Sequence, residues 1–136
     1  MMDGMMKKVM FLHGLESKPW GSKSLFLKEI GHEVVCPALI KNDFEESVRI
    51  ARDCLKKEKP DVVVGSSRGG AVALHLDIDE ERLVLIAPAW KRFGCSYNPP
   101  KVSGVILHSS DDDVIPYSDS EELAKLGGYA LFDIGE

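Results

Sequence analysis

Six short apolar runs, separated by segments with helical character, limit the fold of this chain more than any other feature. Each run is almost continuously apolar, as parallel strands that are covered on both faces require. The runs occupy residues 8–12, 33–36, 61–64, 83–87, 102–108 and 129–132. Helices are expected between them at residues 22–30, 43–59, 68–76 and 118–126. The helix from residue 43 has the spacing of a capping box, and the helix from residue 118 repeats it.

The order of these segments is β-α-β-α-β-α-β-loop-β-α-β. This order predicts an α/β fold, with an open and mostly parallel six-stranded sheet and helices on both faces. In such sheets, functional sites form at the carboxyl ends of the strands. We therefore expect reactive side chains directly after the apolar runs.

The composition of the chain excludes several classes of protein before any motif is considered. The 136 residues fit one domain, and 44% hydrophobic with 29% charged residues are values typical of a globular chain. A net charge of −5 argues against a nucleic-acid or anionic-membrane partner held by bulk electrostatics, and no apolar run is long enough to span a membrane. Three cysteines without a CxxC pair indicate free thiols in a reducing, cytoplasmic compartment.

The sharpest motif is the glycine-rich turn at residues 65–70, Gly-Ser-Ser-Arg-Gly-Gly. It fits G-x-S-x-G between a strand and a helix, which is the context that a nucleophile elbow needs. Gly65 and Gly69 would approach each other closely, and Ser67 would be a nucleophile in a sparsely populated backbone region such as φ > 0. Ser66 occupies the variable position. The alternative is a turn that packs or binds a phosphate, as in a flavodoxin-like domain.

Together with this turn, two further stretches give the chain a family resemblance. Phe-Leu-His-Gly-Leu follows the first run at residues 11–15, and His-Ser-Ser-Asp-Asp-Asp-Val-Ile-Pro follows the fifth at residues 108–116. The sequence resembles the α/β-hydrolase superfamily, and it is most similar to small, cap-less bacterial serine esterases. The resemblance implies a minimal α/β-hydrolase fold with strand order 2-1-3-4-5-6. It also implies an oxyanion hole made by the backbone N–H groups of Leu15 and Arg68.

The same resemblance implies a catalytic acid at Asp112. The alignment of Ile115-Pro116 with the family's V-P pair gives this register, although Ser109 stands where the family usually has glycine. Asp111 and Asp113 remain alternatives, because a register can shift by one residue. The three aspartates also suggest a cation site, but the spacing of a calcium loop is absent. We expect no metal and no cofactor.

The family's catalytic histidine follows the acid in the sequence, and this chain has no histidine after His108. We therefore expect residues 1–136 to be one hydrolase-like domain without a cap, truncated before the base. His13 is expected to be a structural member of its loop, and His75 a helix residue. His13 and His108, each at the end of a strand, are the alternative bases. We predict that no histidine joins Ser67 to Asp112.

The predicted function is hydrolysis of a small carboxylic ester or thioester through an acyl-serine intermediate. The alternatives are a catalytically inactive hydrolase-fold module that binds a ligand, or the flavodoxin-like phosphate-binding domain. The loop at residues 88–101 is too short for a helical cap, and its aromatic residues either line an acyl pocket or cover the sheet edge. An exposed edge strand predicts association as a homodimer.

Overall fold

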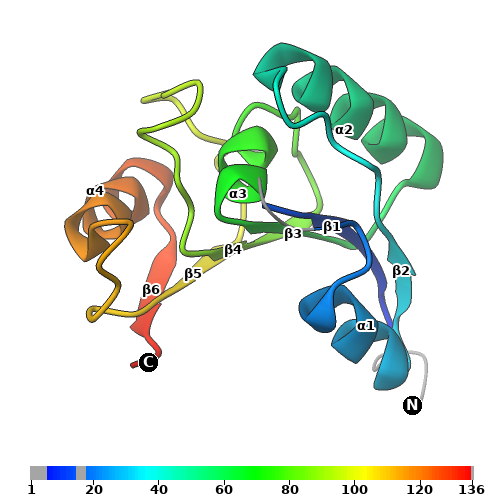
Figure 1. Cartoon of the computed structure of the whole chain (residues 1–136), viewed down its shortest axis with the longest axis horizontal. Coiled ribbons are helices and arrows are strands. Elements are labelled where there is room, and N and C mark those ends of the chain that lie inside the picture. Colours follow the sequence, from blue (N-terminus) through cyan, green and yellow to red (C-terminus); the bar gives the residue numbers. More distant parts are fainter. Residues whose placement is uncertain (1–5, 15–17, 136) are drawn as a thin grey trace.

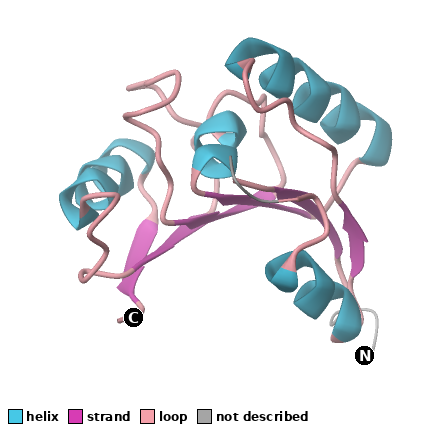
Figure 2. Ribbon diagram, in the orientation of Figure 1, coloured by secondary structure: helices cyan, strands magenta, loops and turns pink. Residues whose placement is uncertain are grey.

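The computed structural model describes residues 6–14 and 18–135. The described chain follows the predicted order, in which strands and helices alternate except that a loop joins β4 to β5 (Figures 1 and 2). They are β1 (Lys8–Leu12), α1 (Ser22–Glu29), β2 (Glu33–Val35), α2 (Phe44–Glu58), β3 (Val62–Ser66), α3 (Arg68–Ala73), β4 (Arg82–Ile86), β5 (Gly104–His108), α4 (Tyr117–Gly127) and β6 (Ala130–Asp133).

The six strands form one sheet in the order β2-β1-β3-β4-β5-β6, which confirms the predicted order. Every pair of neighbouring strands is parallel. In the pairing of β1 with β3, Leu12 lies opposite Gly65. The loop after β1 and the turn after β3 therefore leave neighbouring strand ends at the same edge of the sheet.

The helices cover the two faces unequally. Figure 1 shows α2, α3 and α4 on one face of the sheet and α1 alone on the other. Because side chains alternate along a strand, neighbouring residues of β1 enter different cores. Met10 and Leu12 pack into the larger core with residues of α2, α3 and α4, whereas Val9 and Phe11 pack into a smaller core beside α1. We call these the covered face and the α1 face.

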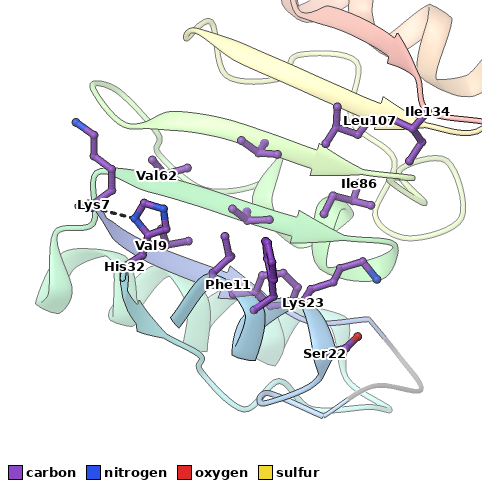
Figure 3. A pocket seen from close by; sticks show the side chains of 14 residues that line it. Lys7, Val9, Phe11, Ser22, Lys23, His32, Val62, Ile86, Leu107 and Ile134 are labelled. Carbon is purple, nitrogen blue, oxygen red and sulfur yellow. Dashed lines mark hydrogen bonds between the residues drawn. The ribbon is translucent and has the colours of Figure 1, made fainter. Parts of the chain in front are cut away.

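The α1 face contains a cavity with a volume of about 590 Å³. Figure 3 shows side chains of β1, β3, β4 and β5 together with Ile134 around it. Its apolar lining includes Phe11, Phe26, Ile86 and Leu107, and Lys7 and Lys23 contribute charged side chains. Ser67 is not among the lining residues, so this cavity lies apart from the elbow.

The helix ends agree with the sequence in one case and differ in another. The Asp43 side chain accepts a hydrogen bond from the Glu46 N–H (3.0 Å) and caps α2 as predicted. The predicted cap at Ser118 is wrong, because α4 begins one residue earlier and follows Pro116 without a side-chain cap. The fixed φ of proline suits a helix start, so this helix needs no capping box.

Candidate active site

Ser67 occupies the turn between β3 and α3 with φ 54° and ψ −117°. The predicted positive φ is confirmed, and such a conformation costs a non-glycine residue about 1–3 kcal/mol. Neighbouring backbone holds it in place: the Ser67 N–H donates to the Ile86 carbonyl (2.9 Å), and the Ser67 carbonyl accepts from the Ala89 N–H (3.0 Å). The end of β4 therefore fixes the turn from both sides of the serine.

The two glycines of the motif are required by close backbone approaches. A Cβ atom on Gly65 would lie 2.6 Å from the Gly69 carbonyl oxygen, and one on Gly69 would lie 2.0 Å from the Leu12 carbonyl oxygen. The start of α3 thus packs directly on the end of β1. This packing accounts for the glycines without a bound phosphate.

The loop after β1 is held by His13. The buried ring accepts a hydrogen bond at Nε2 from the Leu39 N–H (3.1 Å), so Nδ1 carries the proton and donates to the Gly14 carbonyl (2.9 Å). Both ring nitrogens are thereby used, which fits a structural histidine better than a base. Leu15, the expected oxyanion-hole donor of this loop, lies outside the described residues.

Arg68, the other expected donor, is the first residue of α3. Its backbone N–H belongs to the first turn, where helical N–H groups have no partner within the helix. Its side chain points away from water and is only 2% exposed. Burial lowers the pKa of this guanidinium, and the nearby Asp43 carboxylate opposes that effect.

Asp112 lies in the loop after β5, held by backbone on one side. Its Oδ1 accepts hydrogen bonds from the N–H groups of Val114 (2.8 Å) and Ile115 (2.9 Å). Burial acts to raise its pKa, but these two bonds and His108 outweigh burial and lower the pKa below the usual value. The carboxylate is therefore an anion at neutral pH. Asp111 and Asp113, the alternative acids, are exposed.

His108 is fully buried beneath this loop. Its Nε2 lies 3.1 Å from Asp112 Oδ2 and 3.0 Å from the Ile115 carbonyl oxygen, so Nε2 donates to both. Its Nδ1 then accepts from the Ser120 hydroxyl at 2.7 Å. Both nitrogens are engaged on the side of Asp112 and α4, and neither is free to accept the Ser67 proton.

The other two histidines are engaged elsewhere. His32 Nδ1 accepts from the Lys7 N–H, and His75 Nε2 bonds the Gly94 carbonyl. As predicted, no hydrogen bond among residues 6–14 and 18–135 joins a histidine ring to Ser67 Oγ. The described residues bring together the predicted nucleophile and one oxyanion donor, and they hold the predicted acid without a base between it and Ser67.

The aromatic residues of the loop at 88–101 cover helices and do not surround Ser67. Trp90 is 1% exposed and donates its indole N–H to the Asp119 carbonyl of α4 (2.8 Å). Tyr97 packs against its edge, with ring centroids 5.4 Å apart. Phe93 stacks on Phe44 of α2 at 6.2 Å. These contacts are with α2 and α4, so they confirm neither of the two expected roles, an acyl pocket or a cover for the sheet edge.

In the described part of the chain, no group of three or more His, Cys, Asp or Glu side chains is arranged to hold a metal ion. None of its helices combines the length and the apolar character needed to cross a membrane. Cys36, Cys54 and Cys95 are free thiols.

Sequence reasoning missed three contributors to this region: Ser120, Ser47 and the segment at residues 39–40. Ser120 bonds His108, while Ser47 and residues 39–40 surround the side chains of Arg68 and His13. None of these residues belongs to a motif, and each reaches its partner only through tertiary packing. The sequence offered one signal, a serine within each of two predicted helices, because serine is unfavourable inside a helix unless its hydroxyl has a partner.

Comparison with known proteins relates the fold to solved structures. No protein-family model and no curated protein matches the sequence. Among solved structures, Est1E from Butyrivibrio proteoclasticus is similar with a TM-score of 0.81 and 14% identity over 94% of this chain and 77% of that one. A monoacylglycerol lipase from Paleococcus ferrophilus gives 0.71 and 15% over 93% and 84%.

A third similar structure, from Xanthomonas campestris pv. campestris, bears the name of a hydrolase of the alpha/beta superfamily. Its TM-score is 0.70 and its identity 18%, over 96% of this chain and 86% of that one. These likenesses cover nearly the whole chain at low sequence identity. The chain therefore has the α/β-hydrolase fold.

Proposed function

We propose that this chain is a serine hydrolase of small carboxylic esters or thioesters, with Ser67 as its nucleophile. The observation that carries the proposal is the backbone of Ser67, at φ 54° and ψ −117° between β3 and α3. Strain of this kind persists where the surroundings enforce it, and it is concentrated at active sites. Here the glycines at 65 and 69 and the hydrogen bonds to β4 enforce it.

In the proposed reaction, Ser67 Oγ attacks the carbonyl carbon of the substrate while a base takes the hydroxyl proton. The oxyanion that develops accepts hydrogen bonds from the Arg68 N–H and from the expected donor Leu15. Collapse of the tetrahedral intermediate expels the alcohol or thiol, which takes up the proton, and leaves the acyl group on Ser67. Attack by water then releases the carboxylic acid and restores the serine.

Asp112 is proposed as the acid that orients the base and stabilises it when protonated. Its lowered pKa supports this role, because only the carboxylate can do so. Neither His13 nor His108 is available as the base, because both ring nitrogens of each already form hydrogen bonds. We therefore expect the 136-residue chain to hydrolyse esters weakly and to respond to imidazole supplied in solution.

The absence of a helical cap between β4 and β5 supports a small substrate. The monoacylglycerol lipase in the comparison carries an ester activity in its name, and an ester substrate is the one that we carry over to this chain.

Labelling with a fluorophosphonate tests the proposal directly. We expect phosphonylation at Ser67, located by mass spectrometry, and an increase of about tenfold or more in its rate with added imidazole, because general bases contribute about 10²–10⁴ in rate. Ser67→Ala should abolish labelling, whereas Ser66→Ala, one residue away, should retain it. Hydrolysis of a short p-nitrophenyl ester, corrected for imidazole alone, should follow the same pattern.

A catalytically inactive binding module is the second candidate, and the engagement of all four histidine rings favours it. The two candidates separate on the same measurement. If the chain with imidazole is labelled no faster than Ser67→Ala, Ser67 is not a nucleophile and the hydrolase proposal is wrong.

A further inference from the structure

We propose that the side chain of Arg68 is a positioning residue, which holds the nucleophile elbow against the segment at residues 39–40. This inference rests on the proposed function, because it concerns how the backbone N–H of the same residue is aimed at the oxyanion. The sequence assigns Arg68 a role through its backbone alone. The structure adds a role for the guanidinium.

The guanidinium spans from α3 to the loop before α2. Its Nη2 donates to the Ile40 carbonyl (2.9 Å) and lies 3.4 Å from the Ser47 hydroxyl of α2. The Ser47 hydroxyl in turn accepts from the Ile40 N–H and donates to the Ile40 carbonyl, both at 2.9 Å. Both backbone groups of Ile40 are therefore hydrogen-bonded to Ser47. Because these bonds hold Ile40 in place, the bond from Arg68 to its carbonyl holds Arg68 in place as well.

Aromatic rings complete the surroundings of the guanidinium. Its central carbon lies 5.6 Å from the ring centroids of both Phe44 and Phe93, a distance at which a cation is attracted to a ring face. Burial of a charged group is unfavourable unless its donors are satisfied, so this arrangement restricts the side chain to one place. An alkyl side chain of similar length would fill the space without that restriction.

The same short segment also holds the other side of the predicted oxyanion hole. Leu39, the residue before Ile40, donates its N–H to His13, and His13 bonds the Gly14 carbonyl. The loop after β1 and the elbow after β3 are thus tied to adjacent residues. Residues 39–40 act as a common support that sets the position of the two loops relative to each other.

The elbow needs such support because α3 is short. It has six residues, two of them glycine, and it follows a strained serine, so local propensity does little to fix its direction. The contact of Gly69 with Leu12 sets how closely α3 approaches β1. The bond from Arg68 to Ile40 adds a second point, which restrains the rotation of α3 about that contact.

The test measures how fast a fluorophosphonate labels Ser67 in saturating imidazole over a range of reagent concentrations. This gives two quantities, the maximal labelling rate and the affinity for the reagent. Arg68→Met should lower the maximal rate about 10- to 100-fold and leave the affinity unchanged, because a displaced donor fails at the transition state. Arg68→Lys should retain part of the rate, since its ammonium can still donate to Ile40. Arg52→Met, in α2 and bonded to the His75 carbonyl, is the matched control and should label normally.

Ser47→Ala provides an independent arm, because it weakens the support without altering any residue of the elbow. We expect its maximal rate to fall several-fold, and the double variant with Arg68→Met to lose no more than Arg68→Met alone, as residues acting through one contact are not additive. If Arg68→Met fails to fold, as judged by urea unfolding, Ser47→Ala and Arg68→Lys decide the question. A normal rate in Ser47→Ala, or in folded Arg68→Met, overturns this inference while leaving Ser67 as the nucleophile. Absence of labelling in the unaltered chain overturns the proposed function instead.

Discussion

The covered face and the α1 face of the sheet differ in how completely their apolar side chains are enclosed. On the covered face, three helices bury strand residues such as Met10, Leu85 and Ile106 to complete exclusion from solvent. On the α1 face, one helix shields part of the sheet, and a cavity of about 590 Å³ reaches from Phe26 to Leu107. The same strands thus contribute to a closed core and to an open one.

The difference shows where the candidate site gains its rigidity. Arg68 is tied to the loop before α2, His108 to Ser120 of α4, and Gly69 to the backbone of β1, all through the covered face or the strand ends. None of these ties uses the cavity. We infer that the covered face determines the geometry of the site, and that the α1 face affects mainly stability and association.

The largest effect is expected from Gly69→Ala, which would break the junction of α3 with β1. The added Cβ would lie 2.0 Å from the Leu12 carbonyl oxygen, and backbone cannot move aside without separating the two elements. We expect a loss of more than about 4 kcal/mol, or no folded protein. Gly21→Ala, with its nearest atom at 3.9 Å, should cost less than about 1 kcal/mol in the same urea titration. Similar losses in both would contradict the tight junction.

The pair Leu85→Ala and Leu107→Ala compares the two faces directly. Leu85 is fully buried on the covered face, and Leu107 is half-buried beside the cavity. Removing the first should cost about 2–5 kcal/mol of unfolding free energy, and removing the second about 1–2 kcal/mol, because the second site already contacts open space. Equal costs, measured by urea unfolding, would show that the α1 face is closed in solution.

A smaller effect is expected from the pH dependence of Asp112→Asn. The folded-state pKa of Asp112 is lowered, so its ionised form stabilises the fold above the unfolded value of about 4 and loses that contribution as the pH falls through the folded value. The stability difference between the unaltered chain and Asp112→Asn should therefore be present at pH 7 and shrink below pH of about 4. A difference that stays constant between pH 7 and pH 3 would show that Asp112 is not held as an anion.

The smallest effect on stability concerns the edge of the sheet. Phe132 of β6 is 54% exposed at the end of the strand order, where the described residues provide no further strand for the backbone groups to pair with. Phe132→Lys should change the unfolding free energy by no more than about 0.5 kcal/mol, and it should weaken the proposed association through this edge. Sedimentation velocity over a range of concentrations measures this, with Val114→Lys, in an exposed loop, as the control. Association unchanged by Phe132→Lys would exclude β6 as the contact.

The predicted fold followed from the sequence because its signals are local and strong. The first apolar run coincides with β1 at Lys8–Leu12, and Asp43 caps α2 as its spacing indicated. Errors arose where one local signal competed with another. The helix begins at Tyr117, directly after Pro116, although Ser118 and Glu121 have the spacing of a cap. The glycines at 69 and 70 are explained by packing on β1 and on Pro88, which no propensity reveals.

Part of the candidate site could also be predicted from local signals, and part of it could not. The conformation of Ser67 could be predicted, because G-x-S-x-G after a strand leaves few backbone solutions. The partners of Arg68, His13 and His108 could not, because each bond depends on where distant elements lie. Hydrogen-bond partners of buried side chains are a property of the packed chain, and one sequence alone does not encode them in any local pattern.

The position of β1 between β2 and β3 has a consequence for the time course of folding. β1 pairs with β3, and the Lys8 N–H bonds the Asp61 carboxylate across 53 residues of sequence. Pairings of such separation close slowly, since a long loop loses entropy before any contact compensates for it. We expect β3 and β4, which are joined by a short helical connection, to associate before β1 inserts beside them. The elbow would then acquire its strain only in the last stage, when the Leu12 carbonyl arrives against Gly69.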